Sequence, residues 1–170
     1  MPRIKISGYF NGATKESKKV LDAAITTGFL AGQCFRLASG AGDAYSHNEV
    51  EVCDTAGESV FGIVLESSTD YDGPSGMNIP SSSKVTILHG HAEFFIDHEA
   101  EVAAATFASG TCAYEYGATF VLNAPLFVNA SGKLSPTVAA YSGSLYLPVA
   151  KTTQIPSAAN DYTLGVLLLG

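Results

Sequence analysis

Apolar residues occur along most of the chain in short runs, and clusters of Gly, Ser, Asn, Asp and Pro separate these runs. Runs of five to eight residues that recur roughly every ten positions are typical of the strands of a β-barrel or β-sandwich. We predict eight strands, at 33–37, 49–53, 59–66, 84–89, 92–97, 125–129, 145–152 and 162–169. The predicted fold class is therefore all-β.

Helical periodicity occurs in one place, between residues 13 and 25. Four apolar residues could share one helix face there, after a Lys-rich turn: Val20, Leu21, Ala24 and Ile25. We therefore expect one short helix within an N-terminal arm at 1–27, followed by a β-barrel domain at 28–170.

Turn residues predict two further features. His89-Gly90-His91 has the composition of a bend between two strands of one hairpin. The segment 67–83 is polar and rich in Ser, Asp, Gly and Pro, which is typical of a surface loop.

Charge is unevenly distributed along the chain. The 170 residues have a formal net charge of −7, yet residues 1–19 contain five basic residues and one acidic residue. The remaining 151 residues therefore carry a net charge of −11. Because affinity for nucleic acids begins with neutralised phosphates, we expect no nucleic-acid partner for this acidic body, with the basic arm as the one exception.

Charged residues are also scarce. They make up 15% of the chain, against about 25% in typical soluble domains. The scarcity is greatest at 102–160, where Glu115, Lys133 and Lys151 are the only charges in 59 residues. We expect this stretch to form contacts between subunits, and a solvent-facing surface without charges is the alternative.

The cysteines and the N-terminus indicate the compartment. Cys34, Cys53 and Cys112 show no CxxC spacing and lie among apolar residues, so we expect buried free thiols in a reducing environment. The N-terminus has no apolar signal segment, and no run reaches the roughly 18 apolar residues of a membrane helix. We therefore expect synthesis in the cytoplasm and no membrane partner.

The best candidate for a metal site contains His89, His91 and Glu93, which would lie on one side of a single strand. Such a triplet could hold a divalent metal, and it resembles the first half of a cupin motif. The cupin Glu would follow three or four residues later, where this chain has Phe95 and Ile96. No second Gly-framed His follows downstream, since His98 is the last His of the chain. We expect no metal or other cofactor. A cupin-like metal-binding enzyme or sensor of small molecules is the alternative function.

Other catalytic motifs are incomplete. The segment 73–77 lacks the last Gly of a nucleophile elbow, and 70–74 begins like a calcium loop but loses the next ligand. Neither a phosphate-binding loop nor a dinucleotide fingerprint occurs. We expect no enzymatic activity and no small-molecule substrate.

Several segments follow one another in a distinctive order. They are LAGQCFRL at 30–37, FGIVLE at 61–66, VTILHG at 85–90, PLFVNASGKL at 125–134, PVA at 148–150 and YTLGVLLL at 162–169. This order resembles the small head-decoration, or cement, proteins of tailed bacteriophages. Two departures are PVA, where that group usually has a Gly, and the long segment 67–83.

The resemblance implies a single β-barrel or β-tulip-like domain with an extended N-terminal arm. It also implies a non-enzymatic protein of the virion, assembled in the host cytoplasm. Such a protein binds the outer surface of the expanded capsid as a homotrimer and stabilises it by bridging subunits of the major capsid protein.

The basic arm is our candidate for the capsid-binding segment. Five residues would pair with acidic groups of the shell, Arg3, Lys5, Lys15, Lys18 and Lys19, and four would fill apolar grooves, Ile4, Ile6, Tyr9 and Phe10. Ile4 and Ile6 alternate with Arg3 and Lys5, as a strand added to the edge of a sheet requires. A solubilising tail is the alternative interpretation.

A third candidate function is a secreted adhesion or carbohydrate-binding domain. Five tyrosines could serve such a role: Tyr45, Tyr71, Tyr114, Tyr116 and Tyr141. The absence of a signal segment and of Trp speaks against it.

Overall fold

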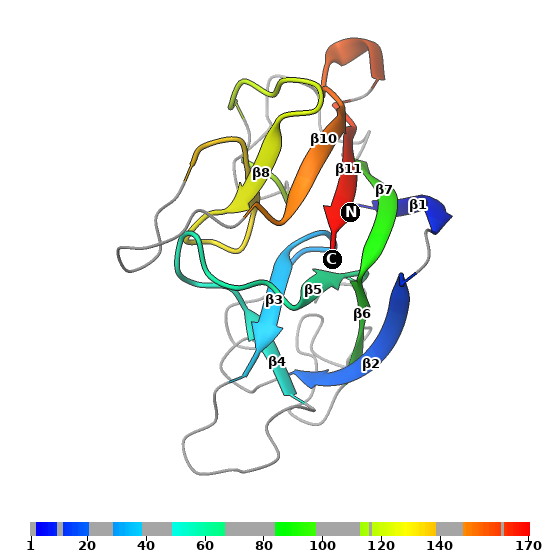
Figure 1. Ribbon diagram of the computed structural model, residues 1–170, viewed down its shortest axis with the longest axis vertical. Helices are drawn as coiled ribbons and strands as arrows, with labels where there is room; N and C mark the ends of the chain where they lie inside the picture. Colours follow the sequence, from blue (N-terminus) through cyan, green and yellow to red (C-terminus); the bar gives the residue numbers. More distant parts are fainter. Residues whose placement is uncertain are drawn as a thin grey trace, which may run out of the picture.

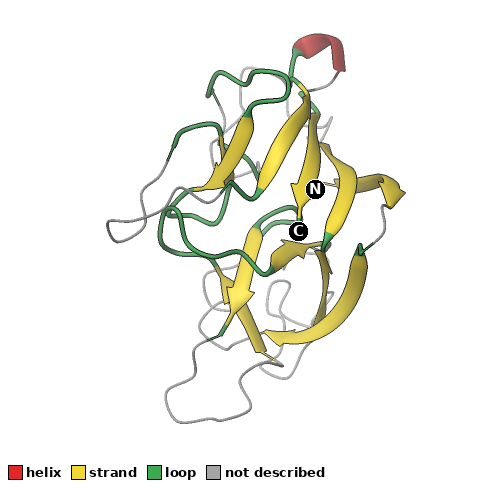
Figure 2. Ribbon diagram, viewed as in Figure 1, coloured by secondary structure: helices red, strands yellow, loops and turns green. Residues whose placement is uncertain are grey.

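The computed structural model of the chain consists of a closed β-barrel and a six-stranded sheet (Figure 1). It describes residues 3–9, 12–20, 29–38, 49–66, 84–97, 113–115, 117–138, 148–160 and 162–170. Strands dominate these residues, and one short helical turn lies at the end of the sheet (Figure 2). The prediction of an all-β barrel fold is confirmed.

The six-stranded sheet has the strand order β1-β7-β11-β10-β8-β9. Its strands are β1 (Arg3–Tyr9), β7 (His91–Asp97), β8 (Pro125–Val128), β9 (Leu134–Ser135), β10 (Ala150–Gln154) and β11 (Leu164–Leu169). All neighbours are antiparallel, and the 3-10 turn η4 (Ala158–Asn160) lies between β10 and β11 in the chain.

The barrel closes in the order β2-β4-β3-β5-β6, with β6 pairing back to β2. Its strands are β2 (Thr14–Val20), β3 (Cys34–Leu37), β4 (Glu49–Val52), β5 (Gly62–Val64) and β6 (Lys84–His89). The β2–β4 pair is parallel, and the other pairs are antiparallel.

Residues of the barrel and of the sheet pack together in one buried cluster, which we call the shared core. In β6, Ile87 packs with Val50 in the cluster that fills the barrel, whereas Leu88 packs with Phe94 and Leu126 of the sheet. Strands with two buried faces carry continuous apolar runs because neither face meets water. The three residues of β5 are all buried, as in such a strand, whereas β6 alternates from Lys84 to Ile87 and places Leu88 in the shared core.

The predicted hairpin around Gly90 is wrong. β6 pairs with β2 and β5, whereas β7 pairs with β1 and β11. Gly90, with φ of 84°, directs the chain out of the barrel and into the sheet. The local sequence indicates a bend, but the strands on either side choose partners that are distant in the chain.

A matching bend lies opposite, at Gly12 between β1 and β2. A Cβ atom at Gly90 would collide with the carbonyl oxygen of Gly12. On one side of this crossing β1 pairs with β7, with Arg3 opposite Asp97, and on the other side β2 pairs with β6, with Lys19 opposite Lys84. One bent antiparallel ribbon therefore joins the barrel to the sheet.

The helix prediction is wrong for residues 14–20, which form β2. Glu16, Lys18 and Val20 are more buried than Lys15 and Ser17, so burial alternates with the period of two that strands show. Pairing with β4 and β6 outweighs the weak helical pattern. Residues 21–28, Phe10 and the predicted loop at 67–83 lie outside the described residues.

We predict that Gly90→Ala lowers the free energy of unfolding by at least about 3 kcal/mol, because strain at positive φ adds to the collision with Gly12. Gly12→Ala is the matched control. Gly12 has φ of 95°, but a Cβ there meets nothing within 4 Å, so only about 1–2 kcal/mol is expected. Urea unfolding followed by circular dichroism measures both losses, and equal losses would contradict a close crossing.

Candidate functional site

The described part of the proposed capsid-binding arm forms two paired strands. β1 is the terminal strand of the six-stranded sheet, and its partner in that sheet is β7. Arg3 lies opposite Asp97 and Lys5 opposite Phe95. The other side of β1 has no partner among the described strands, so the structure presents this strand at a sheet edge.

Ile4 and Ile6 occupy the alternate positions of β1. They lie opposite Ile96 and Phe94, which are fully buried in the shared core. The proposed contact of Ile4 and Ile6 with a groove of the shell stays a prediction.

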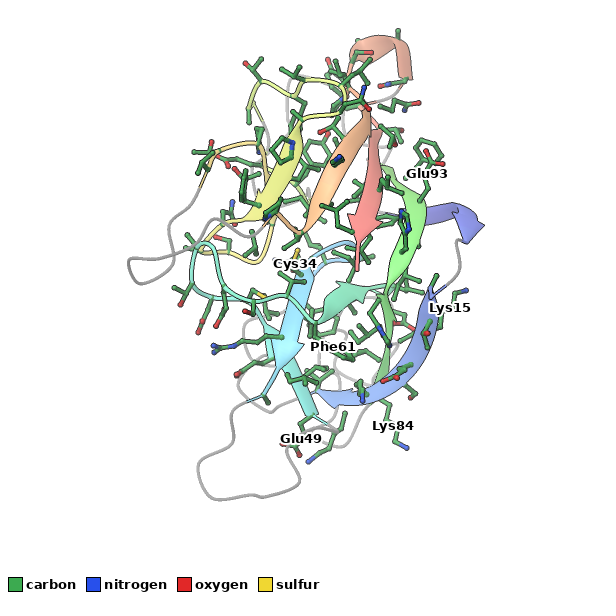
Figure 3. All side chains as sticks on the ribbon, in the orientation of Figure 1. Lys15, Cys34, Glu49, Phe61, Lys84 and Glu93 are labelled. Carbon is green, nitrogen blue, oxygen red and sulfur yellow. The ribbon has the colours of Figure 1, made fainter. Side chains whose placement is uncertain are left out.

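The lysines of β2 have partners within the barrel. Lys18 Nζ lies 2.9 Å from a carboxylate oxygen of Glu16 and 5.3 Å from the centre of the Phe61 ring. Lys19 Nζ lies 2.8 Å from Oε1 of Glu49. Lys15 is exposed on the outside of the barrel (Figure 3).

His89, the last residue of β6, belongs to the same cluster as Glu16, Lys18 and Phe61. Its ring packs against Phe61, with centroids 4.8 Å apart, and its Nε2 lies 3.3 Å from Glu16 Oε1. The hydrogen bond from Lys18 is the main cause that lowers the pKa of Glu16; partial burial opposes this shift, and His89 adds to it. The cluster therefore holds charges in fixed pairs beside the bend at Gly90.

His89, His91 and Glu93 do not form the single row that strand alternation predicts. Gly90 interrupts the alternation, so that His89 belongs to the barrel, whereas His91 and Glu93 belong to the sheet. Within the described ranges, no group of three His, Cys, Asp or Glu residues is arranged to hold a metal ion.

The sequence patterns did not indicate the densest charge cluster, which is centred on Arg36 of β3. Its Nε lies 3.0 Å from Glu51 and its Nη2 3.4 Å from Asp54, and its Nη1 bonds Glu58. Burial opposes the charged guanidinium, but the carboxylates of Glu51, Glu58 and Asp54 outweigh it and raise the pKa of Arg36. Arg36 and Glu51 lie opposite each other on β3 and β4, and pairing of these two predicted strands could have indicated this part of the cluster.

Glu58 connects this cluster to the backbone. Its side chain is 5% exposed, and its Oε2 accepts a hydrogen bond from Asp54 N at 3.2 Å. A hollow of about 400 Å³ lies alongside, lined by Arg36, Leu37, Glu58, Ser59, Val60 and Phe61. Arg36 and Glu58, the two charged residues of that lining, are bonded to each other. Because Glu58 also accepts the hydrogen bond from Asp54 N, the cluster stabilises the turn after β4.

The described cysteines are buried free thiols, as predicted. Cys34 and Cys53 lie in the shared core, and Cys53 N donates a hydrogen bond to Cys34 O at 3.0 Å (Figure 3 labels Cys34). Burial raises the pKa of Cys34 to about 12 and raises the pKa of Cys53 as well. Cys112 lies outside the described residues.

Tyr114 is part of the core rather than of a sugar-binding surface. It is 2% exposed, its ring packs edge-on against Phe120, and its hydroxyl donates to Tyr162 O at 2.6 Å. The other four tyrosines of that hypothesis, Tyr45, Tyr71, Tyr116 and Tyr141, lie outside the described residues.

We predict that Arg36→Met destabilises the protein by about 3 kcal/mol, because it leaves the buried Glu58 carboxylate without its cation. Arg36→Met combined with Glu58→Leu should recover part of this loss, since the most buried carboxylate is removed together with its cation, while Glu51 and Asp54 remain at more exposed positions. Lys19→Met, which removes the more exposed pair with Glu49, should cost less than about 1 kcal/mol. Urea unfolding of the three variants provides the test, and a loss for Arg36→Met no larger than that for Lys19→Met would disprove the structural role of the cluster.

A second prediction concerns the thiols, measured in a Cys112→Ser background. Neither Cys34 nor Cys53 should react with Ellman's reagent at pH 8 in the folded protein, because both are inaccessible and un-ionised. Both should react after unfolding in guanidinium chloride. Above the unfolded pKa of about 8.5, the unfolded state loses these protons first, so stability should fall as the pH rises. Rapid reaction of either thiol in the folded state would contradict this.

No helix within the described residues is long and apolar enough to span a membrane. A scan against protein-family models finds no match for this chain, and no curated protein matches its sequence.

Proposed function

We propose that this chain is a structural protein of a tailed-bacteriophage virion that binds the outer surface of the expanded capsid. In this role it bridges neighbouring subunits of the major capsid protein, as a homotrimer, and stabilises the shell. The order of the strand-forming segments supports the proposal, since strands β3, β5, β6, β8, β10 and β11 follow one another as in the cement-protein pattern.

The observation that carries the proposal is the basic strand β1 at the edge of the six-stranded sheet. An edge strand presents backbone N–H and C=O groups that a strand of another protein can pair with. Arg3 and Lys5 add positive charge to this edge on a chain whose net charge is −7. Such an edge suits a shell protein that offers an extended segment and acidic groups.

A strand that is already formed also lowers the cost of binding. A disordered arm must lose conformational entropy when it orders on a capsid. β1 has seven residues with a fixed register on β7, so less ordering remains to be done. Three such edges on one trimer would act together and multiply modest individual affinities.

The scarcity of charge in the second half supports the oligomeric part of the proposal. A contact between subunits that buried unpaired charges would cost several kcal/mol. Of the three charges at 102–160, Glu115 and Lys133 are half-buried and Lys151 is exposed. The described part of this stretch therefore has much surface that can be covered without desolvating a charge.

Co-sedimentation of the full chain with expanded capsids that lack it tests the proposal. Arg3→Gln with Lys5→Gln should reduce the apparent affinity about tenfold or more, because the loss occurs at each copy of the trimer. Lys84→Gln removes a positive charge from an exposed position of β6 in the barrel and should leave the affinity within about twofold.

A deletion provides the second arm of this experiment. It is limited to residues 1–9, because β2 is part of the barrel. Occupancy of the capsid should be lost in this variant, while circular dichroism reports whether the barrel still folds. Failure of the wild-type chain to co-sediment would overturn the proposed function, and unchanged occupancy in both arm variants would overturn the role of β1.

A further inference from the structure

Three large apolar side chains are exposed together at one end of the six-stranded sheet. Val121 is 57% exposed, Leu122 53% and Ile155 40%. Val121 and Leu122 precede β8, and Ile155 follows β10. Figure 1 shows the loop before β8 and the turn η4 at the same end of the sheet. We call the residues 117–124 and 155–160 the sheet tip.

Backbone hydrogen bonds fasten the first half of the sheet tip to β10. Asn123 N donates to Thr152 O at 2.9 Å, and Thr152 N donates to Ala124 O at 3.0 Å. Ala124 N also donates to Val121 O at 3.1 Å, which closes the loop. The exposed side chains therefore sit on a backbone that is already fixed, so little conformational entropy remains to be lost on binding.

Asn160 orders the second half of the sheet tip. Its side-chain amide donates to Ile155 O at 2.8 Å, and its Oδ1 accepts from Ser157 N at 2.8 Å. Tyr162 N donates to Ser157 O at 2.8 Å. Together these bonds hold Ile155 at a defined place beside η4.

The sheet tip is also free of charge. Residues 117–132 and 152–160 contain no Asp, Glu, Lys or Arg, and the nearest charges in the chain are Glu115, Lys133, Lys151 and Asp161. An exposed apolar surface without charges on a fixed backbone is typical of a protein contact site.

The net charge of the chain and the uncharged sheet tip together favour one kind of partner. Two copies of a chain with a net charge of −7 repel each other, and like charges brought together at an interface cost several kcal/mol. Residues 117–124 and 155–160 carry no charge, so two copies that meet through them bring together no like charges of these residues. An acidic or a basic partner would find no complementary charge there. We infer that the sheet tip, through Val121, Leu122 and Ile155, is the surface by which copies of this chain associate with one another.

The sheet tip lies apart from the proposed capsid-binding strand. It is built on β8 and β10, and β7 and β11 lie between these strands and β1 in the same sheet. A self-association surface here deepens the proposed function, on which it rests for its biological role, because it leaves the β1 edge available to the shell. The two surfaces can therefore be tested separately.

Light scattering of the purified full-length chain without capsids tests the sheet tip. The wild-type chain should be an oligomer, with a mass near three times 17.6 kDa for a trimer. Leu122→Asp should raise the dissociation constant by a factor of about 30 or more and shift the mass toward 17.6 kDa. The reason is that each copy would bring a negative charge into the contact.

Leu37→Asp is the matched control. Leu37 is also an exposed leucine, at 41%, but it lies on β3 of the barrel, and the substitution adds the same charge. It should leave the oligomer intact. Circular dichroism and thermal unfolding check that both variants are folded, and Val121→Ser gives a milder second variant at the sheet tip should Leu122→Asp not fold.

The outcomes separate this inference from the proposed function. A wild-type monomer, or an oligomer that persists in both sheet-tip variants, would overturn the inference, even if the chain still binds capsids. An oligomer that dissociates in the sheet-tip variants alone supports it, whether or not the wild-type chain co-sediments with capsids.

Discussion

The close crossing of two backbones at Gly12 and Gly90 is the contact on which the rest of the structure depends. It allows the β1–β2 segment and the β6–β7 segment to remain paired while both pass from the barrel into the sheet. A side chain at Gly90 would push these backbones apart. Because β6 contributes to the barrel core and also to the core shared with the sheet, the two units are expected to fold as one.

Several of the described ionic groups are paired within the barrel and the turn after β4. Arg36 compensates three carboxylates around the turn after β4, and Lys18 is held between Glu16 and the Phe61 ring. Buried charges require such partners, since an unpaired carboxylate in the core would cost several kcal/mol. The basic residues of the N-terminal region are therefore divided in role. Those of β2 help to hold the barrel, whereas Arg3 and Lys5 lie on the edge strand of the sheet.

The two surfaces that we propose as partner sites on the described sheet differ in chemistry. The β1 edge offers backbone groups and positive charge, which suits an acidic or strand-presenting shell. The sheet tip offers apolar side chains and no charge, which suits another copy of this chain. Because the sheet tip is built on β8 and β10, and β1 lies at one edge of the same sheet, a single molecule could bind sister copies and a larger assembly at the same time.

The sequence by itself determined the fold class and the positions of most strands. Apolar runs bounded by turn residues identified β3 to β8, β10 and β11, although some ends differ, because burial of apolar side chains is recorded directly in the local pattern. The same burial made Cys34 and Cys53 recognisable as core thiols.

Only the tertiary structure decided which strands pair and what each charge does. β2 has a polar sequence and becomes a strand because β4 and β6 provide its hydrogen bonds. His89 and His91 are separated because Gly90 leads from one unit to the other, and Arg36 meets Glu58 across 22 positions of the chain. Such contacts join residues that are distant in sequence, and their energies depend on geometry that local spacing does not encode.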